Sequence, residues 1–181
     1  DGLALAGAVT AEWGETDTRC ELTTMALGPD YSNDGVSALL DQQPDLHYSQ
    51  PADMPQAVVD LLRTDSVLAF VRGKMEFGPR ALCQRSIVYH AHNKDINVWL
   101  NNQLHRTEFM PFAPVTTDLL AEVCFTDWTS ADASAEYMTM TYDCKPVMAA
   151  QCPAVVHIDN TARPQVIRKE KDPFMFELIQ K

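Results

Sequence analysis

One stretch of the sequence decides how the rest of the chain can fold: Gly73-Lys74-Met75-Glu76-Phe77-Gly78-Pro79-Arg80-Ala81-Leu82-Cys83-Gln84-Arg85-Ser86. It follows the apolar run 66–71, which predicts a buried strand, and it precedes a second short apolar run at 87–90. Two glycines, a proline and three cations between strands suit a loop that brings backbone N–H groups and positive charge to an anion. A solvated surface turn would have the same composition, so composition alone leaves both interpretations open.

The length and composition bound the kind of protein. The chain has 181 residues with 46% hydrophobic side chains, which is typical of a globular protein with one sizeable core or one domain with an appendage. No apolar run approaches the roughly 18–20 residues that a membrane helix needs. Because it begins at Asp1, we expect a fragment or an excised domain.

The cysteines predict neither a zinc site nor a disulfide framework. They are odd in number and scattered, without a CxxC pair, which is compatible with a reducing cytoplasm. The five are Cys20, Cys83, Cys124, Cys144 and Cys152.

The distribution of charge is more informative than its sum. The formal net charge of −11 argues against general affinity for nucleic acid. Yet the first 62 residues hold one cation, Arg19, whereas six cations lie between Arg72 and Arg106. This concentration favours local binding of a compact anion such as phosphate.

Capping residues and periodicity predict an α/β domain whose binding site lies at strand ends. Trp99 is expected in the core. Helices are expected at 3–12, from Ser32 or Asn33 to about Leu40, at 55–62 behind Asp53, at 96–104 behind Asn93 or Asp95, from Thr116 or Thr117 to Val123, and from Pro173 onward. Strands or extended segments are expected at 22–27, 66–71, 87–90, 135–142, 154–158 and 165–167.

Three clusters carry candidate chemistry. Lys74, Arg80, Arg85 and Ser86 surround the Gly/Pro loop, which lacks the GxxxxGK[ST] pattern of a phosphate-binding P-loop but offers bidentate Arg contacts and a Lys charge. The second is Arg106-Thr107-Glu108, whose cation is as compatible with a helix C-terminus as with a ligand. The third is His157-Ile158-Asp159-Asn160-Thr161-Ala162-Arg163 after a predicted strand.

Histidine pairs do not extend this list. His90 and His92 resemble a metal pair, but the sequence places no third ligand, so no metal site is predicted.

These clusters belong to longer motifs that resemble a known family. Residues 73–82 with 85–87, Asn101 and Leu104 with 106–114, and 153–165 resemble, in the same order, motifs of the NodU/CmcH-type O-carbamoyltransferases, including G(R/K)MEFGPRALGxRSI. The resemblance covers roughly residues 22–181. It implies a YrdC-like domain with a twisted mixed sheet flanked by helices, and it makes residues 1–21 the tail of a preceding actin-like ATPase-fold transferase domain.

The resemblance also implies an activity. In such enzymes the YrdC-like domain activates carbamoyl phosphate with ATP to carbamoyl-adenylate, releasing pyrophosphate, and the larger N-terminal domain transfers the carbamoyl group to a hydroxyl at a site that holds iron. This chain would then carry at most the activation half-reaction, with Mg²⁺ entering on ATP and no metal site of its own. The alternative is a non-catalytic YrdC-like module that binds a nucleotide or RNA.

The resemblance and the chemistry together assign the site. Lys74 and Arg80 match the family's anion-binding cations and are the expected catalytic residues, while Thr161 matches the residue that contacts the adenylate. Chemistry adds further phosphate or carbamoyl contacts: Arg85, Ser86, Arg106 and Arg163.

The sequence departs from the family pattern at three positions. Cys83 and Asn160 stand where the family usually has glycine, and Met110 stands where it frequently has arginine. Cys83 is expected to tighten the turn or alter the approach of the backbone, whereas Asn160 tolerates left-handed backbone and should do little damage. Met110 removes a cation and suggests a subgroup with a different pocket.

Overall fold

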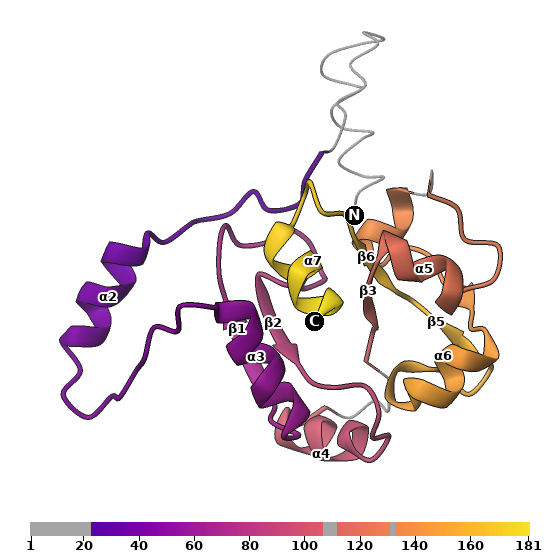
Figure 1. The fold of residues 1–181 in the computed structure, drawn as a ribbon, viewed down its shortest axis with the longest axis horizontal. Coiled ribbons are helices and arrows are strands. Elements are labelled where there is room, and N and C mark those ends of the chain that lie inside the picture. The colour runs from indigo at the N-terminus through magenta and orange to yellow at the C-terminus, as the bar shows by residue number, and fades with distance from the viewer. Residues whose placement is uncertain (1–22, 107–111, 131–132) are drawn as a thin grey trace, which may run out of the picture.

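The computed structural model describes residues 23–106, 112–130 and 133–181. Within these residues, short strands and helices alternate in an α/β domain, which confirms the predicted class (Figure 1). The α-helices are α2 (Asn33–Asp41), α3 (Met54–Arg63), α4 (Ile96–Gln103), α5 (Asp118–Cys124), α6 (Pro146–Gln151) and α7 (Pro173–Gln180). The strands are β1 (Leu68–Val71), β2 (Arg85–Val88), β3 (Val115–Thr117), β4 (Tyr142–Asp143), β5 (Thr161–Ala162) and β6 (Gln165–Ile167).

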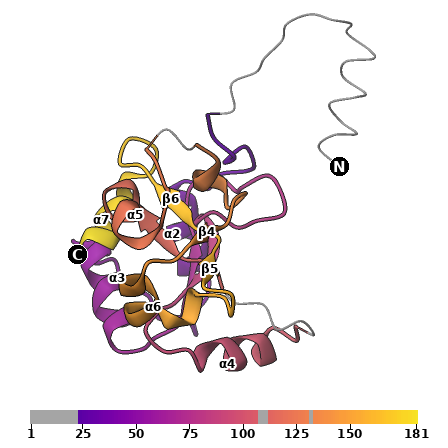
Figure 2. The same cartoon turned by 90° about the vertical axis from the view of Figure 1, so that its right-hand side faces the viewer.

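The strands pair two by two. β1 and β2 run antiparallel with Val71 opposite Arg85, β3 and β6 run parallel, and β4 and β5 run antiparallel. The expected mixture of strand directions is therefore present, but in the described residues it is divided among three small sheets and not joined in one. Figure 2 shows β4 and β5 side by side, with α4 at the lower end of the molecule.

The predicted helices form where their capping residues lie. Ser32 Oγ accepts a hydrogen bond from Gly35 N at 3.1 Å, and Asp53 Oδ1 accepts one from Gln56 N at 2.9 Å, so each satisfies an N–H of the first turn. α7 begins at Pro173 as predicted. The helix predicted at 3–12 lies outside the described residues.

Two predicted strands are wrong because both segments form tight 3₁₀ turns. Residues Ala133–Tyr137 form η1, which buries the small side chain of Ala135 completely. Residues Pro153–Val155 form η2, in which Ala154 N donates to Ala91 O at 3.1 Å and Ala154 O accepts from Asn97 Nδ2 at 2.7 Å. These backbone groups are thus committed to partners outside any strand.

Two further predictions fail. The described part of 22–27 is an irregular segment: Ala26 N and Leu27 N donate within it, and Met25 O accepts from Phe77 N in the loop 73–86. Trp99 is 51% exposed and not in the core, because α4 buries the face that carries Asn97, Leu100 and Asn101.

The core consists of two apolar clusters on either side of the parallel pair. One gathers around α5 and α6, and the other lies between α3 and α7, which pack together; α7 also packs against β3. The four described cysteines are free thiols. None of the helices in the described part of the chain has the length and apolar character that crossing a bilayer requires.

Candidate functional site

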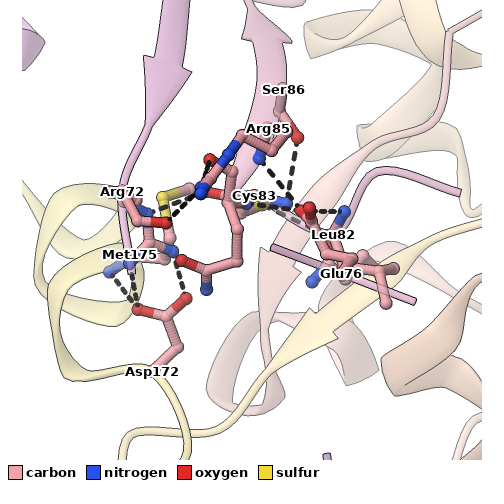
Figure 3. A network of polar contacts seen from close by, with 10 residues as sticks. Arg72, Glu76, Leu82, Cys83, Arg85, Ser86, Asp172 and Met175 are labelled. Carbon is pink, nitrogen blue, oxygen red and sulfur yellow. Dashed lines mark hydrogen bonds and ion pairs between the residues drawn. The ribbon is translucent and has the colours of Figure 1, made fainter. Parts of the chain in front are cut away.

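The loop 73–86 joins β1 to β2 and is shaped by one carboxylate. Glu76 Oε1 accepts hydrogen bonds from three backbone N–H groups: Leu82 N at 2.7 Å, Gln84 N at 2.6 Å and Arg85 N at 3.1 Å (Figure 3). Partial burial acts to raise the pKa of Glu76, but these backbone hydrogen bonds outweigh it and hold the pKa below its usual range. Glu76 is therefore charged near neutral pH, and its carboxylate is the anion that these N–H groups of the loop bind.

Arg72 ties the other side of the loop to the last helix. Its Nε donates to Cys83 O at 2.8 Å, and its two terminal nitrogens form a bidentate pair with the carboxylate of Asp172 (Figure 3). Asp172 Oδ1 also accepts from Met175 N at 3.1 Å and so caps α7. The guanidinium lies 5.1 Å from the ring centre of Phe174. The loop is thus anchored to a helix 100 residues later in the sequence.

Cys83 shows why its position favours glycine. Its φ is 71°, a left-handed conformation that side chains disfavour, and its own N–H donates to Ser86 Oγ at 3.0 Å. The thiol is 4% exposed and donates to Gln165 Oε1 at 3.2 Å. Burial raises the pKa of the thiol to about 12, which makes Cys83 a packed side chain and a poor nucleophile.

Arg85 braces the loop from within, so its predicted contact with phosphate would have to compete with these bonds. Its Nη1 donates to Arg72 O at 2.7 Å and to Gln84 O at 2.9 Å, and its Nη2 donates to Gly73 O at 3.2 Å. The guanidinium also lies 5.8 Å from the ring centre of Tyr31. Ser86 is occupied in the same way by Cys83 N.

An N-terminal segment runs alongside the loop. Gly28 N donates to Met75 O at 2.8 Å, Met75 N donates to Pro29 O at 3.0 Å, and Phe77 N donates to Met25 O at 2.7 Å. A Cβ on Gly28 would come within 2.9 Å of Met75 O, so only glycine allows this close approach. The segment 25–29 therefore holds the outer edge of the loop.

Lys74 and Arg80 are left available by this arrangement. Both side chains are exposed, and neither forms a hydrogen bond or an ion pair within the described parts of the chain. The three charged residues that shape the loop, Arg72, Glu76 and Arg85, are all partly buried. The loop thus separates the cations that hold its shape from the cations that face solvent.

The turn 157–163 is the second part of the site. Asn160 has φ 64°, which confirms that it takes the left-handed conformation, and its Nδ2 donates to Cys144 O at 3.0 Å. Asp159 Oδ1 accepts from Thr161 N at 3.1 Å and from Thr161 Oγ1 at 2.8 Å. Thr161 Oγ1 also lies 3.4 Å from His157 Nδ1, so the turn orients its hydroxyl through two neighbours.

Arg163 connects this turn to the loop. Its Nε is buried and has no hydrogen-bond partner among the described residues. Burial lowers the pKa of Arg163, and the positive charge of Arg80 lowers it further. Arg80 of the loop and Arg163 of the turn therefore repel each other. Such a pair is stabilised by a shared anion.

The second motif is only partly described. Arg106 is exposed and lies 5.6 Å from the ring centre of Phe112, and it is not linked by any described contact to Arg80 or Arg163. Glu108 and Met110 lie outside the described residues. Asn101 is 5% exposed, yet within the described ranges neither its side-chain nitrogen nor its oxygen has a hydrogen-bond partner.

Sequence reasoning gave no role to several of these residues, namely Arg72, Glu76, Asn101 and Asp172. Glu76 carried a usable signal, because it is the single acid in a loop of cations. Arg72 and Asp172 lie too far apart in the sequence for their pairing to be predicted.

Metal ligands do not gather in the described residues, where no group of three or more His, Cys, Asp or Glu side chains is placed to hold an ion. His90 Nδ1 and His92 Nδ1 are in contact, and His92 Nε2 lies 3.1 Å from Asp65 Oδ1.

The chain is similar to known carbamoyltransferases and their relatives. It is 31% identical over 148 residues to 3'-hydroxymethylcephem-O-carbamoyltransferase of Amycolatopsis lactamdurans, covering 80% of this chain and 27% of that protein. It is 33% identical to nodulation protein U of Rhizobium tropici, covering 66% and 20%, and 29% identical to nodulation protein NolO of Bradyrhizobium diazoefficiens, covering 98% and 33%. The chain thus spans a third or less of the length of these relatives.

The family model described as "Carbamoyltransferase C-terminus" matches residues 59–181. This range contains the loop, the second motif and the turn, so the resemblance read from the three motifs is confirmed. The chain belongs to the carbamoyltransferase C-terminus family.

Proposed function

We propose that this domain activates carbamoyl phosphate with ATP and water. Water releases the phosphate of carbamoyl phosphate as inorganic phosphate and leaves carbamate, whose oxygen attacks the α-phosphorus of ATP to give carbamoyl-adenylate, with pyrophosphate as the leaving group. Another domain of the same polypeptide, the expected actin-like transferase domain before residue 22, then transfers the carbamoyl group to a hydroxyl acceptor. The observation that carries the proposal is Arg163, whose buried Nε has no hydrogen-bond partner among the described residues and whose pKa the charge of Arg80 helps to lower.

Each free group has a role in this reaction. Lys74 and Arg80 are exposed and unpaired within the described residues, so they are able to bind phosphate oxygens as they develop charge during transfer. The Arg163 guanidinium is suited to bind the same anion from the other side. Thr161 presents a hydroxyl that Asp159 holds in place, which suits a hydrogen bond to the adenylate.

Charge compensation favours a polyanion over a single phosphate. Lys74, Arg80 and Arg163, in a chain of net charge −11, would together balance the charge of a triphosphate better than that of a monoanion. Mg²⁺ would arrive bound to ATP, and the domain needs no ligand cage for it. The free thiols of the described cysteines are compatible with the reducing cytoplasm in which we place the enzyme.

The test is ATP–pyrophosphate exchange. We expect radiolabelled pyrophosphate to enter ATP only when carbamoyl phosphate is present. Lys74→Ala, Arg80→Ala and Arg163→Ala should each reduce the exchange by roughly 100-fold, as expected when a group that stabilises transition-state charge is removed. Lys94→Ala, which removes an exposed cation outside the three motifs, is the matched control and should exchange normally.

Two results would contradict the proposal in different ways. A Lys74→Ala variant with normal exchange would overturn the site assignment while leaving the activity standing. Binding of ATP without any exchange would instead favour the non-catalytic nucleotide-binding module. An RNA-binding module would show a steep dependence of RNA affinity on salt concentration.

A further inference from the structure

We propose that Glu76 is the positioning residue of this site: its carboxylate holds the two ends of the segment 77–81 (the arc) together and thereby fixes the position of Arg80. The inference deepens the proposed function and rests on it for the identity of the ligand. Glu76 is the one acid in the loop, and we do not expect its side chain to contact the substrate.

The geometry of the arc supports this role. Glu76 lies at one end of residues 77–81, and Leu82, whose N–H it binds at 2.7 Å, lies at the other end. The additional bonds from Gln84 N and Arg85 N fix the start of β2 to the same oxygen atom. Arg80 is the exposed cation within the arc that these bonds close.

The arc has little else to hold its shape. Gly78 has φ 121°, a conformation that glycine adopts freely, so the backbone does not resist rearrangement there. Phe77, Pro79, Arg80 and Ala81 are all exposed, and packing therefore contributes little to their placement. Phe77 N donates to Met25 O, but this bond fixes only the first residue of the arc.

The three N–H groups also form an anion-binding arrangement, because they converge on one point. Glu76 fills it with a carboxylate supplied by the loop itself. A small external carboxylate such as formate should therefore fill the same place when the side chain is removed. Rescue by formate would therefore distinguish the loss of this carboxylate from a general loss of stability, which formate would not restore.

Other titratable groups surround Glu76 and enter any pH dependence. The thiol of Cys83 is near it, and a cavity of about 200 Å³ that Glu76 lines is shared with Glu136, Arg168, Lys171 and Asp172. Among these, Glu136 is already paired with Arg168 at 2.7 Å and with Lys171 at 2.5 Å, and Asp172 is paired with Arg72. Glu76 is the carboxylate in this group whose partners are all backbone N–H groups.

The direction of the pH effect follows from these bonds. Because they hold the pKa of Glu76 below its usual range, its carboxylate is present at neutral pH and is lost only as the pH falls through that lowered value. The hydrogen bonds from residues 82, 84 and 85 to Glu76 should thus weaken as the pH falls through this lowered pKa. They should stay constant above the ordinary pKa of a glutamate.

The experiment compares Glu76→Ala and Glu76→Gln, with Glu170→Ala as a control that removes an exposed acid outside the site. The affinity for pyrophosphate is measured by calorimetry from pH 3.5 to 7.5, and ATP–pyrophosphate exchange is measured at pH 7.5. The backbone amides of residues 82, 84 and 85 are followed by NMR over the same pH range.

We expect the three amides of the wild type to titrate together and those of Glu76→Gln not to titrate. Glu76→Ala should bind pyrophosphate roughly tenfold more weakly or worse, as expected when a charged group is displaced from its working geometry, and 0.1 M formate should restore much of the affinity. Glu76→Gln keeps an oxygen acceptor, so it should stay within about threefold of the wild type and lose the acid-side decline.

Two results would overturn the proposal: a folded Glu76→Ala variant that binds pyrophosphate within twofold of the wild type, or amides that titrate independently of one another. If the wild type shows no exchange, the proposed function fails. The positioning role is then decided by the amide titration and the pyrophosphate affinity, neither of which requires turnover.

Discussion

The loop 73–86 and the turn 157–163 are both shaped by a carboxylate that binds the backbone, but the contacts of the two carboxylates differ in range. Each contains a carboxylate that accepts a hydrogen bond from at least one backbone N–H group, and each contains a residue with left-handed backbone. Each also supplies an arginine to the site, Arg80 from the loop and Arg163 from the turn.

The two segments differ in the reach of their contacts. Asp159 in the turn is exposed and bonds to a residue two positions away. Glu76 in the loop is partly buried and bonds to residues six to nine positions away, and Arg72 extends the network to Asp172. The carboxylate of the turn therefore acts locally, although Asn160 also bonds to Cys144, whereas the carboxylate of the loop joins distant parts of the loop and Arg72 links them to α7. Substitutions in the loop should cost more and should be felt farther away.

Arg72→Met should have the largest effect. It leaves the carboxylate of Asp172, whose side chain is 13% exposed, without its cation, and it removes the donor to Cys83 O. Loss of one partner from a largely buried ion pair costs about 3 kcal/mol or more. Urea unfolding measures this loss, and Arg63→Ala, which removes an exposed cation that bonds to Lys181 O at 3.0 Å, should cost less than about 1 kcal/mol. Equal losses in the two variants would show that the loop is not anchored to α7.

Glu76→Ala and Asp159→Ala test the comparison directly. Removal of Glu76 leaves three partly buried N–H groups without their acceptor and should lower the free energy of unfolding by about 2 kcal/mol. Asp159 is exposed, and its removal frees only the N–H and the hydroxyl of Thr161, so it should cost clearly less in the same urea titration. The distinction between a tertiary loop and a local turn would collapse if the two losses were the same or were reversed.

Asn160→Ala and Asn160→Gly separate backbone from side chain in the turn. Alanine disfavours φ 64° and loses the bond from Nδ2 to Cys144 O, so it should cost about 1–2 kcal/mol in thermal or urea unfolding. Glycine loses only the bond and should cost about half as much. A glycine variant as unstable as the alanine variant would mean that the amide, and not the conformation, selects asparagine here.

The smallest effect is expected for chemical labelling of Cys83, whose thiol should not react in the native protein. Because burial raises the pKa of its thiol to about 12, iodoacetamide at pH 8 should leave Cys83 unmodified in the native protein and modify it fully in 6 M guanidinium. Peptide mass spectrometry measures both states. Rapid native labelling of Cys83 would show that the loop opens and that its network is weaker than that of the turn.

Features with a local physical cause were predictable from the sequence. Ser32 and Asp53 satisfy N–H groups within the same turn, so the starts of α2 and α3 could be read from their composition. The same holds for the left-handed Asn160. The exposure of Lys74 and Arg80 follows from their setting in a Gly/Pro loop.

Features with a distant cause were not predictable. Residues 135–142 alternate as a strand does, but Glu136 is drawn into an ion cluster with Arg168 and Lys171, and the segment turns to reach them. Likewise, the apolar residues at 154–158 end with Ile158, which is fully exposed, because the backbone of Ala154 is held by α4 and Ala91. The assignment of Arg85 to phosphate could not anticipate that carbonyl groups of its own loop would engage it.

Because Asp172 contacts both Arg72 and the first turn of α7, a change in the loop should be detectable in α7. One carboxylate both pairs with Arg72 and caps the first turn of the helix through Met175 N. Any ligand that tightens the loop should therefore slow hydrogen–deuterium exchange at the amide of Met175, although that residue lies 89 positions beyond the end of the loop at Ser86. Occupancy of the site could then be followed without labelled substrate, and even in variants that no longer turn over.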